Sequence, residues 1–430
     1  MFLARRTAVV LALGALPGLI WPRPATIVVV LAATVIAVGA DALLAASPRD
    51  LRVQRSLDGA IMLGETAIST LTVTNTGSRT AAAEVRDAWA PSAGATGERC
   101  RMTIPAGQRR RARTALTPTR RGDRRADLVT VRLIGPLGLA GRQASLAAPA
   151  RLRVLPPFAS QHHLPSKLAR LRELDGRSAV MVRGAGTEFD SLRQYVVGDD
   201  ARSIDWRSTA RRGEVVVRTW RPERDRRVLI VLDTGRRAAA RLGDAPRLDS
   251  QMEAALLLAA LASRAGDRVD ALAVDSAVRA QVRGASGASL MSSLADAFAP
   301  LDASLVETDW SLLASAVRRL LPQRSLVVIL TGIDGSATDA DMLRATATLA
   351  KDHALIIASA LDPGLAGLRE DRGDAVSVYT AAAAESELVE QHAVRARLAR
   401  SGAEVVQADP AGLPPALADT YLALKASGRL

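Results

Sequence analysis

The segment VLIVLDTGRR, residues 228–237, places a run of apolar residues directly before Asp233. A continuous apolar run of this kind is typical of a parallel strand that is buried on both faces. Further strands are expected over 268–274, 325–331, 354–360 and 404–408. Helical patterns alternate with them, over 248–265, 289–299, 309–321, 341–353, 385–401 and 413–426. The alternation predicts a Rossmann-like α/β domain over residues 228–430, with a parallel sheet covered by helices on both faces.

Before this domain the pattern changes to one of short strands. The stretches LRVQRSL, AISTLTVTN and LVTVRLIG alternate apolar and polar residues between Gly, Asn and Pro. Such alternation is typical of strands with one buried face. We therefore expect a small antiparallel β-sandwich over residues 49–156, followed by a linker with a short helix and a charged motif over residues 157–227.

The first 48 residues contain two apolar segments, 7–21 and 25–46, and the second is interrupted only by Asp41. The second segment is long enough to cross a bilayer. The first is too short by itself and would reach the required length only if Phe2 and Leu3 were also part of the span. A turn at WPRP, residues 21–24, would make a transmembrane hairpin of residues 1–48. A cleaved signal peptide is the alternative, but a second apolar segment follows directly.

Basic residues flank both ends of the expected hairpin. Arg5 and Arg6 precede the first segment, and Arg49, Arg52 and Arg55 follow the second, whereas the turn carries only Arg23. Because positive charge favours the cytoplasmic side, we expect both ends of the hairpin to face the cytoplasm. The rest of the chain is then expected in the cytoplasm as well.

The net charge of +13 comes almost entirely from arginine. It indicates either an anionic partner or simply an arginine-rich composition, and the run of ten Arg between Gly97 and Arg125 could face anionic lipid or solvent. Aromatic residues are only 3% of the chain, which argues against a nucleic-acid surface that stacks bases. The single cysteine and four histidines suggest neither a disulfide nor a histidine-based metal site.

Residues 184–227 read GAGTEFDSLRQYVVGDDARSIDWRSTARRGEVVVRTWRPERDRR and carry dense charge of both signs. We expect the Arg and Asp side chains to pair around Trp206, which would cover the edge of a core. A catalytic role for two of the carboxylates is the alternative, but the segment offers neither nucleophile nor metal.

This segment closely resembles the signature of the domain of unknown function 58 family. The matching residues are Gly184, Gly186, Glu188, Phe189, Arg193, Tyr195, Gly198, Asp199, Arg202, Ile204, Asp205, Trp206, Ala210, Arg211, Arg218 and Glu223. The resemblance extends over most of the chain. It implies a von Willebrand factor A-like α/β domain and frequent association with MoxR-type AAA+ ATPases.

Metal-binding domains of the von Willebrand A type end their first strand in Asp-x-Ser-x-Ser and add a Thr and an Asp from later loops. Here Asp233 matches, but Gly235 and Arg237 stand at the two serine positions. Thr308 matches the later threonine, and Asp334 follows Thr331-Gly332 where Thr-Asp is usual. Because Mg²⁺ needs several oxygen ligands, we expect a degenerate site of Asp233, Thr308 and Asp334 with no bound metal. Arg236 or Arg237 would pair with Asp233 instead.

Three functions fit these observations. The first is a membrane-anchored binding or assembly protein, not an enzyme and without cofactor, that works with a MoxR-type ATPase. The second is an envelope scaffold that needs no ATPase, and the third is a hydrolase that uses the acidic residues of the motif. The chain has no G-x-x-x-x-G-K-[ST] loop for ATP hydrolysis and no G-x-S-x-G serine elbow.

Overall fold

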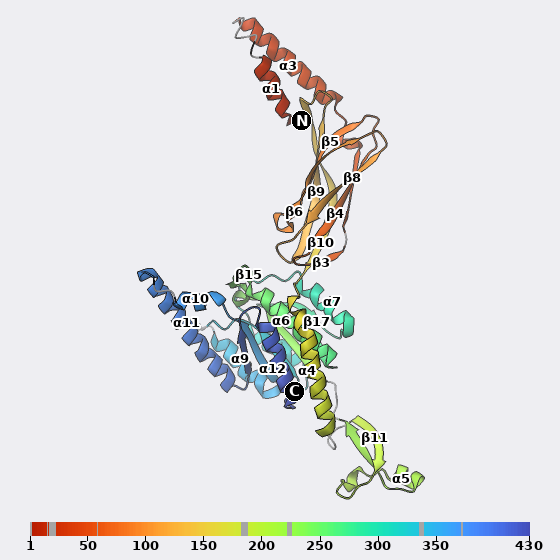
Figure 1. Ribbon diagram of the computed structural model, residues 1–430, viewed down its shortest axis with the longest axis vertical. Coiled ribbons are helices and arrows are strands. Elements are labelled where there is room, and N and C mark those ends of the chain that lie inside the picture. The colour runs from red at the N-terminus through yellow and green to blue at the C-terminus, as the bar shows by residue number, and fades with distance from the viewer. Residues whose placement is uncertain are drawn as a thin grey trace. The chain divides into compact units, whose positions relative to one another are not determined.

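The computed structural model describes residues 2–14, 16, 23–57, 59–181, 188–221, 226–334, 339–370 and 373–430. It divides into two compact units, Met1–Leu155 and Pro156–Leu430. Figure 1 shows helices and a strand-rich region in the first unit, and a mixture of helices and strands in the second.

The first unit begins with two helices that lie beside each other, α1 (Arg5–Gly14) and α3 (Pro24–Leu44). In the described part of the chain, one helical stretch, Pro24–Asp50, is long and apolar enough to cross a membrane, with a mean hydropathy of 2.5. Phe2–Leu3 forms strand β1, which pairs with the sandwich. The prediction that the first apolar segment borrows these two residues is therefore wrong, because their backbone is engaged in a sheet. Trp21 and Pro22 of the expected turn lie outside the described residues.

The end of α3 is fastened to the strands that follow. Asp41 is completely buried, and its carboxylate accepts hydrogen bonds from the backbone amides of Leu137, Leu139 and Ala140, at 2.7, 2.7 and 2.8 Å. Arg142 adds a hydrogen bond of 3.0 Å to the carbonyl of Ala42. The one charge in the apolar segment thus serves as a buried anchor for the loop between two strands.

Two antiparallel sheets make the rest of this unit. Their strands are β2 (Leu51–Leu57), β3 (Ala60–Met62), β4 (Ala67–Asn75), β5 (Ala81–Asp87), β6 (Ala95–Thr96), β7 (Arg99–Ile104), β8 (Arg109–Leu116), β9 (Gly122–Ile134) and β10 (Ala140–Leu155). One sheet has the order β1-β10-β9-β5-β7, with β3 parallel to β10, and the other has the order β2-β4-β8-β6. Residues of both sheets share one apolar core, so the unit is a β-sandwich, as the alternating pattern predicts.

The second unit contains a six-stranded sheet in the order β17-β16-β13-β18-β19-β20. The strands are β13 (Arg227–Asp233), β16 (Arg268–Val274), β17 (Val278–Val282), β18 (Leu326–Leu330), β19 (Ala354–Ala360) and β20 (Glu404–Ala408). All neighbours are parallel except β17, which runs antiparallel at the edge. The chain order therefore reverses at β13, between β16 and β18, which makes the carboxyl end of β13 the expected ligand edge.

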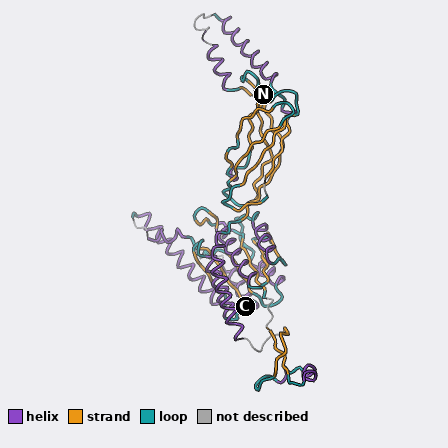
Figure 2. Tube along the Cα trace, turned by 45° about the vertical axis from the view of Figure 1, so that its right-hand side comes forward, coloured by secondary structure: helices purple, strands orange, loops and turns teal. Residues whose placement is uncertain are grey.

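Helices cover both faces of this sheet (Figure 2). The α-helices of this unit beyond the short α5 (Trp206–Arg212) are α4 (Leu164–Met181), α6 (Arg247–Arg264), α7 (Gly287–Phe298), α8 (Trp310–Leu320), α9 (Asp339–Asp352), α10 (Pro363–Glu370), α11 (Ala375–Arg400) and α12 (Leu413–Ala426). Successive residues of β13 enter different cores: Ile230 packs with α6, α7 and α12, and Val231 packs with α8 and α9. Burial on both faces explains the continuous apolar run.

Several elements differ from the prediction, among them β17 and α10, which the sequence patterns do not indicate. The short helix expected in the linker is α4, which has 18 residues and packs against α6 and α12. Helix α11 begins ten residues before the expected start at 385. The ribbon of β11 (Glu188–Gln194) and β12 (Val216–Arg221), with the short helix α5 (Trp206–Arg212) between them, forms a sheet of its own.

Candidate functional site

At the carboxyl end of β13, Asp233 is fully buried among threonines. The Thr308 hydroxyl donates to its Oδ1 and the Thr331 hydroxyl to its Oδ2, both at 2.5 Å, and the amide of Gly235 donates to Oδ1 at 2.9 Å. Thr331 directly follows β18, so the network joins the two strands at which the chain order reverses. Both oxygens of the Asp233 carboxylate therefore accept hydrogen bonds from groups of the same protein chain.

The protonation of Asp233 reflects this burial. Desolvation raises the pKa of its carboxyl above the ordinary value, because the charged form is costly away from water. Hydrogen bonds from Thr308, Thr331 and Gly235 act in the opposite direction, as does the charge of Arg237. The net direction is upward, and the three hydrogen bonds hold the carboxyl group in place, which suits a structural role.

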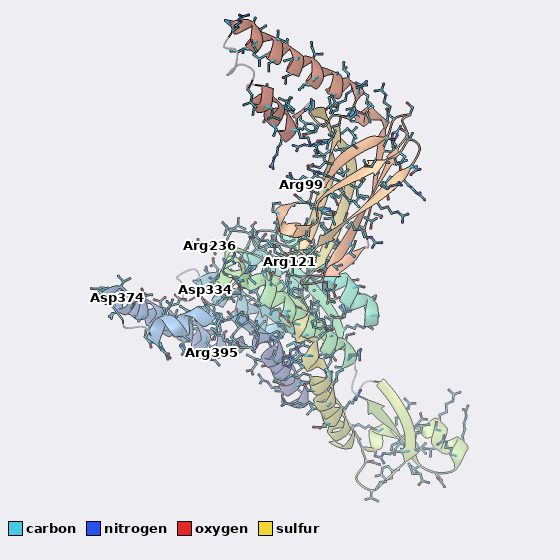
Figure 3. The ribbon with its side chains drawn as sticks, turned by 45° about the horizontal axis from the view of Figure 1, so that its top comes forward. Arg99, Arg121, Arg236, Asp334, Asp374 and Arg395 are labelled. Atoms are coloured by element: carbon cyan, nitrogen blue, oxygen red, sulfur yellow. The ribbon has the colours of Figure 1, made fainter. Side chains whose placement is uncertain are left out.

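An ion pair between Arg247 and Asp334 lies at the same edge of the sheet as Asp233. The guanidinium of Arg247 forms an ion pair of 2.8 Å with Asp334 and donates to the backbone carbonyl of Arg237 at 2.9 Å. Arg237, which is itself buried, donates to the carbonyl of Gly332 at 3.2 Å. Figure 3 labels Asp334 and the exposed Arg236, which pairs with Glu307 at 3.5 Å. We call Asp233, Thr308, Thr331, Arg247 and Asp334 the strand-end network.

The pair expected between Asp233 and Arg236 is wrong, because Arg236 lies at the surface beside Glu307. Arg237 acts on Asp233 through its charge, while the hydrogen bonds of the carboxylate come from Thr308, Thr331 and Gly235. The partner of Asp334 is Arg247, which begins α6 and was not among the residues predicted for the site.

The strand-end network does not fit a divalent cation. A side chain at Gly235, where a serine ligand would stand, would collide with the Thr308 hydroxyl. A side chain at Gly332 would collide with the guanidinium of Arg247. Among the residues that the structure describes, no group of three or more His, Cys, Asp or Glu side chains could hold a metal ion. The hydroxyl groups of Thr308 and Thr331 are committed to Asp233, and the carboxylate of Asp334 is committed to Arg247.

The charged motif folds as a compact ribbon, residues 188–221, which we call the signature module. Arg193 forms a two-pronged ion pair with Asp199, at 2.5 and 2.7 Å, and Asp199 also accepts from the amide of Val196 at 2.9 Å. Gly198 stands in this turn with φ of +110°, a conformation that favours glycine. These residues of the signature build one tight loop.

A second pair closes the other end of the module. Asp205 accepts from the amide of Ser208 at 2.9 Å, which caps α5, and pairs with Arg218 of β12 at 2.7 Å. These hydrogen bonds hold the pKa of Asp205 below its ordinary value, and the Arg193 hydrogen bond does the same for Asp199. The predicted pairing of arginine with aspartate is confirmed for these two carboxylates.

The prediction that Trp206 is buried is wrong, because its side chain is 68% exposed. Trp206 is the first residue of α5, and the cap on Asp205 fixes the helix start without covering the indole. Val196 and Val197 are 62% and 95% exposed, and Tyr195 is also exposed. The aspartate pairs thus support a surface that presents apolar side chains.

Among its described residues, the module also carries five exposed arginines: Arg202, Arg207, Arg211, Arg212 and Arg218. Arg218 is paired with Asp205. The side chains of Glu188 and Phe189, and residues Gly184, Gly186 and Glu223, lie outside the described residues. Within the described part of the module, the surface combines excess positive charge with an exposed tryptophan.

The fold and these two regions define an α/β protein with a β-sandwich and an apolar helix before it. The model of the family described as protein of unknown function DUF58 matches residues 191–408, half of the chain. The chain belongs to this family.

Relatives of this chain are uncharacterized proteins of Mycobacterium bovis and of two Mycobacterium tuberculosis strains. Each is 28% identical over 194 residues, which are 44% of this chain and 60% of the relative. The chain therefore spans about 60% of the length of the curated relatives that it matches.

Among solved structures, the chain resembles a CARDB domain of the PF1109 protein from Pyrococcus furiosus, with a TM-score of 0.18 and 14% identity over 25% of this chain and 88% of that one. A FixG-related protein from Vibrio parahaemolyticus has a TM-score of 0.17 and 10% identity, over 24% and 94% of the two chains. Likeness at this level carries no inference about function.

Proposed function

We propose that this protein is a membrane-anchored binding and assembly protein and not an enzyme, and that it works with a MoxR-type AAA+ ATPase. The observation that carries the proposal is the strand-end network. At the edge where a doubly wound sheet usually holds its ligand, Asp233 is buried and satisfied by Thr308 and Thr331. A general base or a metal ligand needs a carboxylate that can reach a reacting group, and this one is enclosed.

The α/β domain is, in this proposal, a von Willebrand A-like domain whose metal-ion-dependent adhesion site is degenerate. Support comes from the order of the sheet, with five parallel strands and one antiparallel edge strand, and from an aspartate at the end of the first strand. Arg247 supplies a fixed positive charge beside Asp334, so the edge has a cation without a metal.

The membrane part of the proposal places two helices of an N-terminal hairpin in the cell membrane, with the remainder of the chain in the cytoplasm. The apolar stretch Pro24–Asp50 supports one of these spans, and the arginines on both sides of the hairpin support the orientation. The ATPase partner is proposed from the family resemblance, in which this association is frequent.

The test is purification of the full chain from native membranes, in magnesium buffer and in EDTA, followed by identification of the proteins that accompany it. We expect a MoxR-type ATPase in both preparations. Calorimetry of the purified chain in detergent micelles should show no binding of Mg²⁺ or Mn²⁺ at millimolar concentration. A one-site isotherm that disappears in Asp233→Ala would overturn the metal-free site, and loss of the ATPase in EDTA would overturn a metal-independent contact.

A further inference from the structure

The amino-terminal part of α11, residues 375–390, is largely exposed although its first ten residues are uncharged and rich in Ala and Val. Figures 1 and 2 show this part of the helix extending away from the sheet beside α10. Its first ten residues, AVSVYTAAAA, carry no charge, and only Ala381 and Ala384 among them are buried. Tyr379 is 79% exposed and Val376 72% exposed. A helix that is apolar around most of its circumference is usually covered, so this surface is suited to a partner.

The exposed residues form a stripe of small and apolar side chains along one side. Val378, Ala382, Ser386 and Val389 follow each other at helical spacing, and all are exposed. The stripe is long enough to receive a cluster of apolar side chains, and none of its members carries a charge. We call residues 375–390 the α11 arm.

The charges of the α11 arm are acidic. It carries Glu385, Glu387 and Glu390, and the first basic residue of α11 is Arg395. Asp374 caps the helix through the amide of Ser377 at 2.7 Å and adds a further negative charge at its outer end (Figure 3). Arg369 of α10 approaches Glu385 at 3.8 Å, but both side chains are about half exposed, so the pair is weak.

The signature module has the complementary character. Asp199 and Asp205 are paired with Arg193 and Arg218, and the exposed Asp200 and Glu214 are outnumbered by four further exposed arginines. The exposed arginines of α5 and of the turn before it therefore give the module its net positive surface. Trp206 and Val197 stand among these charges as exposed apolar groups. One chain thus carries a basic apolar surface and an acidic apolar one.

We propose that the signature module of one copy docks on the α11 arm of a second copy. Trp206 and Val197 would pack along the stripe between Val378 and Val389, and the arginines would face the glutamates at its rim. Because the two surfaces differ, the contact is head-to-tail, and each bound copy leaves one module and one arm open. Such contacts produce rings or open chains and not only dimers. This inference goes beyond the proposed function, since it requires neither an ATPase nor the strand-end network.

Charge reversal tests the pairing. The first variant is Arg207→Glu with Arg211→Glu in the module, and the second is Glu387→Lys with Glu390→Lys in the arm. Each full-length variant in detergent micelles is expected to self-associate at least about tenfold more weakly than the natural chain in sedimentation velocity. Mixing the two variants should restore association, because a reversed module then meets a reversed arm. Natural assemblies should exceed dimers at high concentration and weaken in about 0.5 M salt.

A matched control is Arg395→Glu with Arg397→Glu, near the other end of the same helix, which should associate like the natural chain. Thermal unfolding of every variant checks that it is folded. Trp206→Ser with unchanged charge should also weaken assembly. The proposal is overturned if the natural chain stays monomeric at high concentration, if either reversed variant assembles normally, or if mixing folded variants restores nothing. Loss of self-association with retained ATPase binding would leave the proposed function intact.

Discussion

At the end of β13 the Asp233 carboxylate is buried and accepts three hydrogen bonds from its own chain, whereas in the signature module Asp199 and Asp205 hold arginines at the surface. Both regions have acidic and basic residues close together, and in both the carboxylates are used for support. The two regions differ in the part of the structure that the carboxylates stabilise. The strand-end network closes the edge of the sheet, and the module's pairs shape loops that expose Trp206.

The comparison is tested most strongly by Asp233→Ala. This change leaves the buried hydroxyls of Thr308 and Thr331 without their acceptor, so we expect the free energy of unfolding of the second unit to fall by about 3 kcal/mol. Denaturant unfolding measures it. Asp244→Ala, at an exposed carboxylate of the same unit, is the control and should leave the transition unchanged. A loss below about 1 kcal/mol would show that the strand-end network is not structural.

The Arg247 pair should have a smaller effect, because Asp334 is partly exposed. Arg247→Met is expected to cost about 2 kcal/mol, mainly by leaving Asp334 without a partner. Adding Asp334→Asn should recover part of this loss, which a double-mutant cycle would reveal. If the two losses simply add, the ion pair contributes nothing to the network.

The stability of the signature module and that of the strand-end network should respond to acid in opposite directions. The pKa values of Asp199 and Asp205 are lowered in the folded module, so their stabilisation is present above the ordinary value of 3.8 and is lost as the pH falls through the folded pKa. The pKa of Asp233 is raised, so its contribution has the opposite sign: stability is greatest below 3.8 and declines as the pH rises through the folded pKa.

Hydrogen exchange, corrected for intrinsic rates, measures this contrast. Between about pH 5 and about pH 3, protection of the Val196 and Ser208 amides should fall, while that of the Gly235 amide should not. Parallel loss of protection at all three amides would mean that the regions do not respond separately.

The smallest effect on stability is expected for Trp206→Ala. An exposed side chain contributes little to folding, so the free energy of unfolding should change by no more than about 0.5 kcal/mol. Calorimetric melting of the full chain checks this. A loss of about 3 kcal/mol would restore the idea of a buried tryptophan and remove the basis for an exposed apolar surface.

The elements that could be predicted from sequence are those whose burial leaves a local pattern. Strands β16 and β19 have the bounds expected, and β13 differs by one residue, because these strands are apolar on both faces. The edge strand β20 also has the expected bounds. Strand β17 reads VRAQV and is mostly exposed at the sheet edge, so it has no such run. The start of α11 was missed because ten uncharged residues with three β-branched side chains among the first six do not show the polar face of a surface helix.

The candidate site could be predicted only in part, because its partners come from distant positions. Asp233 and Thr308 were identified from the end of the strand and the later loop, and they do meet. The partner of Asp334 is 87 residues away in sequence, at the start of α6, where no motif marks it. The exposure of Trp206 depends on what packs over α5, which neither charge pattern nor residue type determines.

The hydrogen bonds that Asp41 accepts from Leu137, Leu139 and Ala140 have a mechanical consequence. They join the last turn of α3 directly to the β9–β10 loop, with no flexible spacer at that point. Arg142 also donates a hydrogen bond to the neighbouring carbonyl of Ala42. If α3 lies in a bilayer, as proposed, a change in membrane thickness that tilts this helix would turn the sandwich with it.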